Sequence, residues 1–414
     1  MNRKTWQAPW SYREGIIIVG GLVALGTIWQ IMLGSSGIQI PSWPGNLYLA
    51  LAFAASLIVF HLLIPKSAFV KWLQSIPAAV TSAGLFCGLA ILMGIIPQLP
   101  ASQPSAISLL GLNKITNTWF YLLANVYFLA CLGMATLKRL IPFKLKNGGY
   151  ILNHLGLWIT LTAASLGSSD LQRLSMDCYE GKIEWRAKTE TGQLVEMPLA
   201  VSLIDFKLDE YLPKITLIDH QTGKIAVNRQ KSQYFSLADA PGTLENYRIE
   251  VETYLPESGF TGDHFERVNE VGAPPAAQLK VRNSETGEIT TGWISSGSFR
   301  QQPFAFRLSD QYSLVMLPPE PRKFQSDIQV LFPDGTQAET TLEVNKPFSI
   351  NGWKLYQLSY DSEKARWSDL SVIELVRDPW LPAVYFGVFM LLAGTLFLLR
   401  DGAAKKKGVQ NGMD

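Results

Sequence analysis

Six apolar blocks, each about long enough to cross a lipid bilayer, constrain the fold of this chain more than any other feature. A transmembrane helix needs roughly 20 predominantly apolar residues. The blocks comprise Gly15–Leu33, Leu47–Leu63, Ala78–Ile96, Trp119–Leu137, Tyr150–Leu166 and Leu381–Leu399, of which the second and fifth are short. No A-x-A-like cleavage site follows the first block, so we expect it to remain as an anchor. The sequence predicts a polytopic α-helical membrane protein with six spans.

The distribution of charge gives the predicted spans an orientation. Basic residues gather before the first block (Arg3, Lys4, Arg13), after the last (Arg400, Lys405, Lys406, Lys407) and in two loops (Lys66, Lys71; Lys138, Arg139, Lys144, Lys146). The loop after the first block has no charge, and the loop after the third has only Lys114. Short basic loops stay in the cytoplasm. We therefore expect both termini inside and the long polar segment between the fifth and sixth blocks outside.

The polar segment, residues 168–378, is long enough to hold a core of its own. Turn signals at Asp219–Lys224, Asn283–Glu288 and Pro333–Thr336 separate runs rich in β-branched residues, which is the pattern of hairpins. Short strands at this spacing predict a β-rich domain, either a sandwich or an irregular barrel. The predicted parts are 1–66 with two helices, 67–167 with three helices, the external domain 168–378, and 379–414 with the last helix and a basic tail.

The external segment is acidic, although the whole chain has a formal net charge of +2. Residues 168–378 contain 31 acidic and 22 basic side chains. A surface of this sign attracts a basic protein partner, or is simply a solvated face. The basic residues mark loops beside anionic lipid, so we infer no nucleic-acid partner.

His154, one turn inside the fifth block, is the polar residue whose position most needs an explanation. Ionisable residues in a membrane span usually face the bundle interior and have a function. A neutral imidazole is a good ligand for haem iron, and Trp158 on the same helical face is placed to pack against a haem plane. The alternative is a hydrogen bond from His154 to a neighbouring helix. His61, near the end of the second block, is a candidate second iron ligand or extends to the interface.

Other reactive residues form no catalytic pattern. Cys87 and Cys131 lie inside predicted spans as small buried residues, and Cys178 is the lone cysteine of the external segment, so no disulfide forms within it. His220 and His264 lie in a turn and a polar loop, with no metal-ligand cluster beside them in sequence. There is no C-x-x-C-H motif, which excludes a c-type cytochrome. The absence of P-loop, G-x-G-x-x-G, H-E-x-x-H and G-x-S-x-G motifs gives no support to phosphate-binding enzymes or hydrolases.

Tryptophans and glycines mark the edges and contacts of the predicted spans. Trp43, Trp119 and Trp380 fall at the outer membrane edge, and Trp6, Trp10 and Trp72 fall at the inner edge. An aromatic belt explains these positions, and a ligand-stacking surface is the alternative. Gly387 and Gly394 in the last block predict close approach of a neighbouring helix.

Several stretches resemble the ResB (also called CcsB) family. The segments "AAVTSAGLFCGLAILMGIIPQLP", "TWFYLLANVYFLACLGMATLKRL" and "NHLGLWITLTAASLG" resemble the first three spans of the family's four-span plan. The most specific resemblance is in "EVNKPFSINGWKLYQLSYD" (Glu343–Asp361), followed by "RDPWLPAVYFGVFMLLAG". It covers about Pro77 to Leu399. The first two spans are additional, so His61 inherits no role from it.

The resemblance implies a subunit of the System II machinery for cytochrome c biogenesis in the bacterial cytoplasmic (inner) membrane. With a CcsA-type partner, such a subunit moves haem across the membrane and supports its attachment to apocytochrome c. His154 matches the family's intramembrane histidine, which implies a haem ligand near the cytoplasmic side. The partner's tryptophan-rich segment is absent, so we expect the partner to hold the haem that is presented for attachment. The implied role is non-catalytic or co-catalytic in a haem lyase.

Two other functions remain open. One is an electron-transfer subunit with a b-type haem between His61 and His154. The other is a haem-free scaffold or sensor whose external domain binds a protein. If the chain does bind haem, the basic loop Lys138–Lys146 is expected to attract the propionates, with Lys144 and Lys146 as the residues to test.

Overall fold

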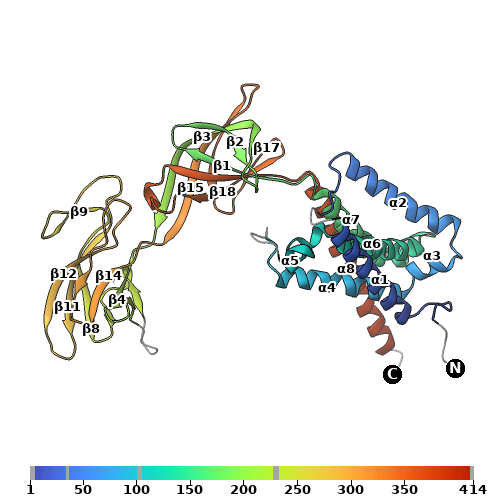
Figure 1. The fold of residues 1–414 in the computed structure, drawn as a ribbon, viewed down its shortest axis with the longest axis horizontal. Coiled ribbons are helices and arrows are strands. Elements are labelled where there is room, and N and C mark those ends of the chain that lie inside the picture. Colours follow the sequence, from blue (N-terminus) through green and yellow to red (C-terminus); the bar gives the residue numbers. More distant parts are fainter. Residues whose placement is uncertain (1–4, 34–36, 100–104, 227–232, 411–414) are drawn as a thin grey trace. The chain divides into compact units, whose positions relative to one another are not determined.

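The computed structural model describes residues 5–33, 37–99, 105–226 and 233–410, the last ten of these by their backbone alone. Arg3 and Lys4 lie outside the described residues, and so do the side chains of Lys405–Lys407. The chain forms two compact units (Figure 1): a helical unit, Met1–Leu171 with Asp378–Asp414, and a β unit, Gln172–Arg377.

The helical unit contains eight α-helices among the described residues. They are α1 (Tyr12–Met32), α2 (Gly45–Leu63), α3 (Ala68–Leu73), α4 (Ile76–Ile95), α5 (Ala106–Leu109), α6 (Trp119–Leu140), α7 (Gly148–Gly167) and α8 (Leu381–Gln410), with short 3-10 turns η1 (Leu112–Asn117) and η2 (Leu145–Asn147). Hydroxyl side chains begin several of them: Ser11 for α1, Ser75 for α4 and Thr118 for α6. Each accepts a hydrogen bond from a first-turn N–H that otherwise lacks a partner, which fixes where the helix begins.

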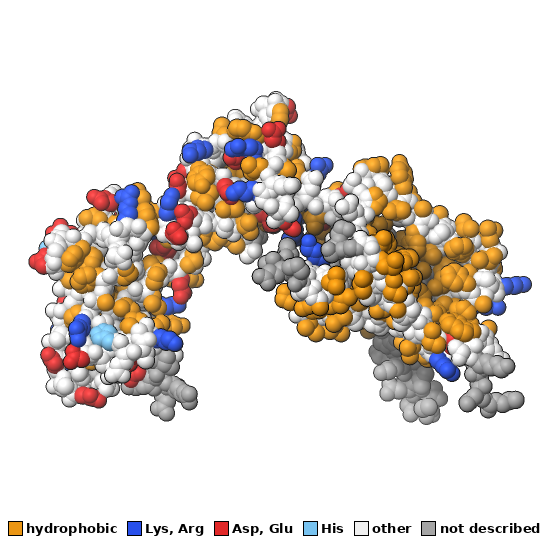
Figure 2. Space-filling view, viewed as in Figure 1, with side chains coloured by type: hydrophobic (Ala, Val, Ile, Leu, Met, Phe, Trp, Pro, Cys, Tyr) orange, Lys and Arg blue, Asp and Glu red, His pale blue; other side chains and the backbone are white. Residues whose placement is uncertain are grey.

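Among the described residues, five stretches are long and apolar enough to cross a membrane. They are Tyr12–Met32, Gly45–Leu63, Ile76–Ile95, Ala106–Leu140 (which contains α6) and Leu381–Arg400. They correspond to five of the six predicted spans. The sixth, α7, has 20 residues but is less apolar, because it carries Asn153, His154 and several small or hydroxyl residues. Hydrophobic side chains cover the visible face of the helical unit, whereas charged side chains are distributed over the surface of the β unit (Figure 2). The chain fits a membrane protein with a large β-rich domain.

Successive long helices alternate in direction, which gives the helical unit two ends. Contacts at the first end are Trp10–Trp72 and Arg139–Tyr150, and contacts at the second are Trp29–Trp119 and Asn46–Asp170. We call these the Trp10 end and the Asp170 end. The chain leaves α7 for the β unit, and returns from it to α8, at the Asp170 end.

The α7 and α8 helices approach closely because glycines face each other. A Cβ atom on Gly156 would lie 2.6 Å from the Gly387 carbonyl oxygen, and one on Gly394 would lie 2.2 Å from the Asn153 nitrogen. Such small residues allow helix backbones to touch. Asn153 also donates from Nδ2 to Thr395 Oγ1 at 2.8 Å. The predicted close contact at Gly387 and Gly394 is confirmed.

The β unit contains nineteen strands among its described residues. They are β1 (Gln172–Tyr179), β2 (Ile183–Lys188), β3 (Leu194–Glu210), β4 (Lys214–Asp219), β5 (Lys224–Ile225), β6 (Tyr234–Ser236), β7 (Gly242–Leu244), β8 (Tyr247–Leu255), β9 (Ser258–Phe260), β10 (Phe265–Arg267), β11 (Ala276–Asn283), β12 (Ile289–Ser295), β13 (Phe306–Arg307), β14 (Tyr312–Met316), β15 (Pro321–Leu331), β16 (Gln337–Glu343), β17 (Phe348–Ile350), β18 (Trp353–Tyr360) and β19 (Leu370–Arg377). The three predicted hairpins are confirmed, since β4–β5, β11–β12 and β15–β16 pair antiparallel across the predicted turns.

Two hydrophobic cores organise these strands. The first lies within an eight-stranded sheet of order β16-β15-β3-β2-β1-β19-β18-β17, which curls so that β16 also packs against β18. The second lies between the sheet β12-β11-β8-β7 and the sheet that contains β4 and β14. Strands β3 and β15 pair with each other, with Glu210 opposite Pro321, and the chain between them builds the second core. The β unit thus combines a curled sheet with a sandwich.

Candidate functional site

His154 lies on α7 near the Trp10 end of the helical unit and is half-buried. Its Nδ1 atom is 3.1 Å from the carbonyl oxygen of Tyr150, one turn earlier. A carbonyl oxygen can only accept a hydrogen bond, so Nδ1 carries the proton and donates it. The lone pair of the neutral ring is therefore on Nε2, for which the described residues provide no hydrogen-bond partner. Metal-binding histidines are commonly oriented in this way, by a bond from the other ring nitrogen to a backbone carbonyl.

A stack of side chains holds the His154 ring. The rings of Tyr150 and His154 lie 3.7 Å apart between centroids, at an angle of 23°. The guanidinium carbon of Arg139 lies 3.8 Å from the centroid of the same Tyr150 ring. Two groups this close to one ring cannot share a face, so Tyr150 lies between Arg139 and His154. The cation over the ring is an attractive arrangement, and it ties the end of α6 to the start of α7.

The sequence placed Arg139 in the basic loop Lys138–Lys146, but it gave no indication that Arg139 and Tyr150 form a stack with His154. Tyr150 was detectable, because residues four apart lie on the same face of a helix. Arg139 belongs to a different helix, and nothing in its local sequence indicates that it lies over Tyr150.

Both the indole nitrogen and the ring of Trp158 make contacts with other residues of the helical unit. Its Nε1 donates to the Leu129 carbonyl oxygen at 3.2 Å, and its ring is nearly parallel to that of Phe53, with centroids 6.2 Å apart and planes at 8°. Trp158 therefore packs α7 against α6 and α2. Its contact with a haem plane stays a prediction.

His61 lies at the end of α2, at the same Trp10 end as His154. Its Nδ1 is 3.0 Å from Nε2 of Gln74. An amide nitrogen donates, so Nδ1 accepts and the proton of the neutral ring is on Nε2. In this tautomer His61 has no free ring lone pair, in contrast to His154. No hydrogen bond or ring contact joins the two histidines in the part of the chain that the structure describes.

Charge is distributed unequally between the two ends of the helical unit. The Trp10 end carries the basic residues Arg13, Lys66, Lys71, Lys138, Arg139, Lys144, Lys146 and Arg400. Glu14 at the same end is buried and accepts hydrogen bonds from the Ser11 backbone and hydroxyl. The Asp170 end carries Lys114, Asp170 and Asp378. Lys144 and Lys146 are exposed in the short connection between α6 and α7, close in sequence to Tyr150.

Asp170 is a second polar centre that the sequence reasoning missed. Its Oδ1 accepts from the Trp43 backbone nitrogen at 2.9 Å, and its Oδ2 accepts from Asn46 Nδ2 and Trp380 Nε1, each at 2.7 Å. Burial raises the pKa of this carboxyl, but these three hydrogen bonds outweigh burial and the net pKa is lowered. The signal in the sequence was a lone carboxylate directly after a span.

The remaining candidates form no site. In the helical unit Cys131 is buried as expected, whereas Cys87 on α4 is exposed, so the prediction that it is buried is wrong. The other candidates lie in the β unit. His264 is exposed between Asp263 and Glu266, and its hydrogen bonds to these carboxylates raise its pKa. His220 bonds to the Asp310 carbonyl oxygen and to Ser313, and Cys178 is buried. Within the described residues, no group of three or more His, Cys, Asp or Glu side chains is placed to hold a metal ion.

The comparisons with known proteins bear on α7 and the β unit. The model of the ResB-like family matches residues 144–369, which is more than half of the chain. The match includes His154 and most of the β unit, and it is narrower than the resemblance from Pro77 to Leu399, because α4, α6 and α8 lie outside it. No curated protein matches the chain.

Proposed function

Because this chain belongs to the ResB-like family, we propose that it is the ResB-type subunit of a System II cytochrome c synthetase and binds haem through His154. Family membership supports a role in cytochrome c biogenesis. The observation that carries the haem assignment is the bond from His154 Nδ1 to the Tyr150 carbonyl oxygen. It leaves Nε2 with its lone pair available, inside the segment that matches the family. A neutral imidazole is a common axial ligand of haem iron.

The residues around His154 suit this role. The Tyr150 ring and the Arg139 guanidinium hold the imidazole in one orientation, so little freedom remains to be lost on binding. Haem carries two anionic propionates, and Lys144 and Lys146 lie exposed just before α7. We propose that these lysines attract the propionates as haem arrives.

We propose six spans, with both termini in the cytoplasm and the β unit in the periplasm. The alternating contacts at the Trp10 and Asp170 ends favour α7 as a sixth crossing. The basic residues at the Trp10 end favour the cytoplasm for that end, since short basic loops stay inside. In a bacterial inner membrane His154 then lies in the inner leaflet, where haem made in the cytoplasm enters.

The proposed partners are a CcsA-type membrane protein and apocytochrome c. The chain has no C-x-x-C-H and no tryptophan-rich segment flanked by histidines, so the partner presents haem for attachment. In this arrangement the β unit, whose surface is net acidic, contacts basic regions of apocytochrome c or of the partner. The chain itself is a haem-handling, co-catalytic subunit.

The test is haem retention in the complex with a CcsA-type partner. Reduced-minus-oxidised spectra of the purified complex are compared for the wild type, His154→Ala, His61→Ala and the matched surface control His220→Ala. We expect His154→Ala alone to lose most of the haem that this chain holds. Added imidazole restores it, because a free imidazole occupies the space of the missing ring and ligates the iron.

Two results would replace this proposal. If His154→Ala leaves the haem spectrum of the complex unchanged, and the chain without its partner shows no haem spectrum, the chain is a haem-free scaffold or sensor. Loss of the spectrum in both His61→Ala and His154→Ala, in a chain that binds haem without any partner, indicates an electron-transfer subunit with both histidines as ligands.

A further inference from the structure

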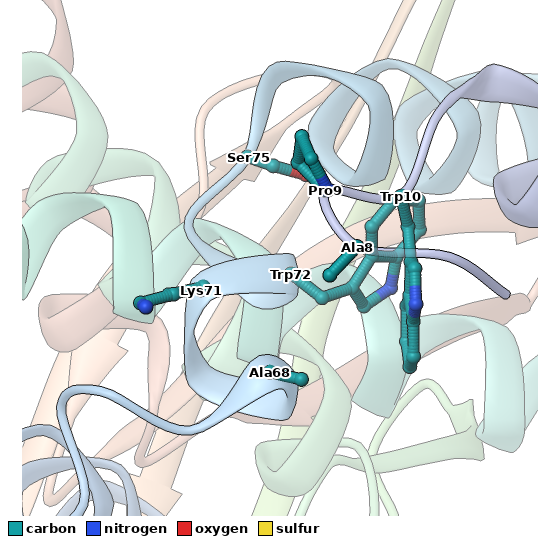
Figure 3. A pocket seen from close by; sticks show the side chains of 7 residues that line it. All are labelled: Ala8, Pro9, Trp10, Ala68, Lys71, Trp72 and Ser75. Atoms are coloured by element: carbon teal, nitrogen blue, oxygen red, sulfur yellow. The ribbon is translucent and has the colours of Figure 1, made fainter.

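A cavity of about 270 Å³ opens at the Trp10 end of the helical unit (Figure 3). It is lined by Ala8, Pro9, Trp10, Ala68, Lys71, Trp72 and Ser75. Its walls come from the segment before α1, from α3 and from the residue that begins α4. None of these residues belongs to the stack around His154, and all lie outside the residues matched by the ResB-like family.

The walls of this cavity are fixed by contacts within the protein. The rings of Trp10 and Trp72 lie 5.5 Å apart at 54°, and Trp72 is buried, with Nε1 donating to the Tyr127 hydroxyl at 3.1 Å. The segment before α1 is held by Glu14, whose carboxylate accepts from the backbone nitrogens of Trp6 at 3.3 Å and Ser11 at 2.7 Å. A ligand thus meets a site that is largely formed beforehand, as small-molecule sites usually are.

Three features of the cavity attract an anion. Lys71 is exposed at its rim, where its side chain extends away from the two indoles (Figure 3), and the described residues offer it no ion pair. Ser75 lines the cavity and caps α4, a 20-residue helix with no acidic residue in its first turn. The start of such a helix carries an uncompensated partial positive charge. The Ser75 oxygen accepts from the Ala78 nitrogen, so its own hydroxyl proton remains available to donate.

The apolar surroundings of the cavity and its volume indicate which kind of anion it binds. Phe69 and Ile76, which neighbour the lining residues in sequence, are 51% and 71% exposed, as expected of side chains in contact with acyl chains. Tryptophan is the residue that favours the border between hydrocarbon and headgroups. The volume of about 270 Å³ lies below the roughly 300–1,000 Å³ of pockets for drug-sized ligands, which favours a small headgroup over a tetrapyrrole.

We propose that this cavity binds the headgroup of an anionic phospholipid. The phosphate lies between Lys71 and the start of α4, and the glycerol backbone lies against Trp10 and Trp72. The lipid joins the segment before α1 to α3 and α4, in the part of the chain that precedes the family match. This site is independent of haem binding at His154.

The test measures lipid retained by the full chain with native mass spectrometry. The purified protein is offered phosphatidylglycerol or phosphatidylcholine with the same acyl chains. We expect the wild type to retain phosphatidylglycerol preferentially. Lys71→Glu is expected to reduce that adduct about five-fold or more, from the contribution of one lysine beside anionic lipid. Ala68→Phe, which fills the cavity and keeps every charge, is expected to reduce it as well.

The matched control is Lys66→Glu, an exposed lysine that precedes α3 and does not line the cavity; it should retain the lipid. Equal retention of both lipids by the wild type overturns the proposal. So does an equal loss in Lys66→Glu and Lys71→Glu, which indicates general surface charge, or a wild-type adduct in Ala68→Phe. Displacement by inorganic phosphate at equal concentration also overturns it, in favour of a soluble anion. Unfolding midpoints verify that each variant is folded, and Lys71→Gln replaces Lys71→Glu if that variant unfolds.

Discussion

The indole Nε1 of Trp380 donates a 2.7 Å hydrogen bond to Oδ2 of Asp170, across 210 positions of the sequence. Asp170 follows α7 and Trp380 precedes α8, so this bond joins the two helices where the chain enters and leaves the β unit. The same carboxylate accepts from Trp43 and Asn46 at the start of α2. One carboxylate therefore links the ends of three helices, one of which lies in the additional N-terminal part of the chain.

Replacing Asp170 with alanine should destabilise the helical unit. Hydrogen bonds to a charged group contribute about 1.5–3 kcal/mol, and the buried Asn46 side chain loses its charged acceptor. We expect the free energy of unfolding to fall by about that amount, measured by tryptophan fluorescence of the detergent-solubilised chain. Ser168→Ala, which alters an exposed hydroxyl in the same connection, should leave it unchanged. An equal effect of both substitutions would contradict the role of the carboxylate.

The contribution of Asp170 to the free energy of unfolding should decrease at low pH. Its folded-state pKa is lowered, so its stabilisation is fully present above the unfolded-state pKa of about 3.9. It is lost as the pH falls through the folded-state pKa. We expect the difference in unfolding free energy between wild type and Asp170→Asn to be constant from pH 7 to 5 and to shrink below about pH 4. A difference that grows on acidification would refute this assignment.

Adding a methyl group at Gly394 should separate α7 from α8. The new Cβ would lie 2.2 Å from the Asn153 backbone nitrogen, and overpacking of this kind costs about 1–3 kcal/mol. Gly394→Ala should therefore lower the thermal unfolding midpoint. Gly84→Ala is the matched control, because Gly84 is also helical and has nothing within 4 Å of the added atom. Alanine is the better helix former, so this variant should be as stable as the wild type or more stable.

The Tyr150 ring, rather than its hydroxyl, should matter for the orientation of His154. Tyr150→Phe keeps the ring between Arg139 and His154, whereas Tyr150→Ala removes it; the backbone carbonyl that accepts from His154 stays in both. Ring stacking is worth about 0.5–1.5 kcal/mol. We expect Tyr150→Ala to weaken haem retention about two- to ten-fold and Tyr150→Phe to retain the wild-type value. Spectral titration of the purified complex with haem measures both, and equal weakening by the two variants would assign the effect to the hydroxyl.

Thr162 should tolerate loss of its hydroxyl. The Thr162 Oγ1 atom is buried in α7 without a hydrogen-bond partner in the described structure, and an unsatisfied buried polar group is costly. Thr162→Val keeps the shape, and we expect equal or greater thermal stability. Thr136→Val is the control, because Thr136 is also buried but donates to the Leu132 carbonyl oxygen at 2.7 Å. A loss of stability in Thr162→Val as large as in Thr136→Val would show that a water molecule satisfies the Thr162 hydroxyl.

Cys178 should resist alkylation in the folded chain. Burial in the core of the curled sheet raises the pKa of its thiol to about 12, and the thiolate is the reactive form. We expect a membrane-impermeant maleimide to leave Cys178 unmodified at pH 7.5 and to label it rapidly in denaturant, as measured by peptide mass spectrometry. Rapid labelling of the native protein would mean that β1 and its neighbours open readily.

The sequence by itself determined the features that depend on residues close together in the chain. Continuous apolar residues predicted six spans, and five of them are helices long and apolar enough to cross a membrane among the described residues. This prediction works because the cost of placing a polar residue in lipid acts on each position separately. Turn residues such as those at Pro333–Thr336 predicted three hairpins, since a tight turn depends on a few adjacent residues. His154 was singled out because it is an ionisable residue inside an apolar block, and its acceptor on Tyr150 is only one helical turn away.

Tertiary structure alone decided the contacts between distant segments. The contact of Asp170 with Trp380 and the cavity between Trp10 and Trp72 each need segments that are far apart in sequence. The position of Arg139 over Tyr150 depends on how the consecutive helices α6 and α7 pack against each other. The division of the β unit into a curled sheet and an inserted sandwich likewise depends on the long-range pairing of β3 with β15. Local propensity cannot specify such partners, because the free energy that selects them arises from burial and hydrogen bonding once the whole chain has closed its loops.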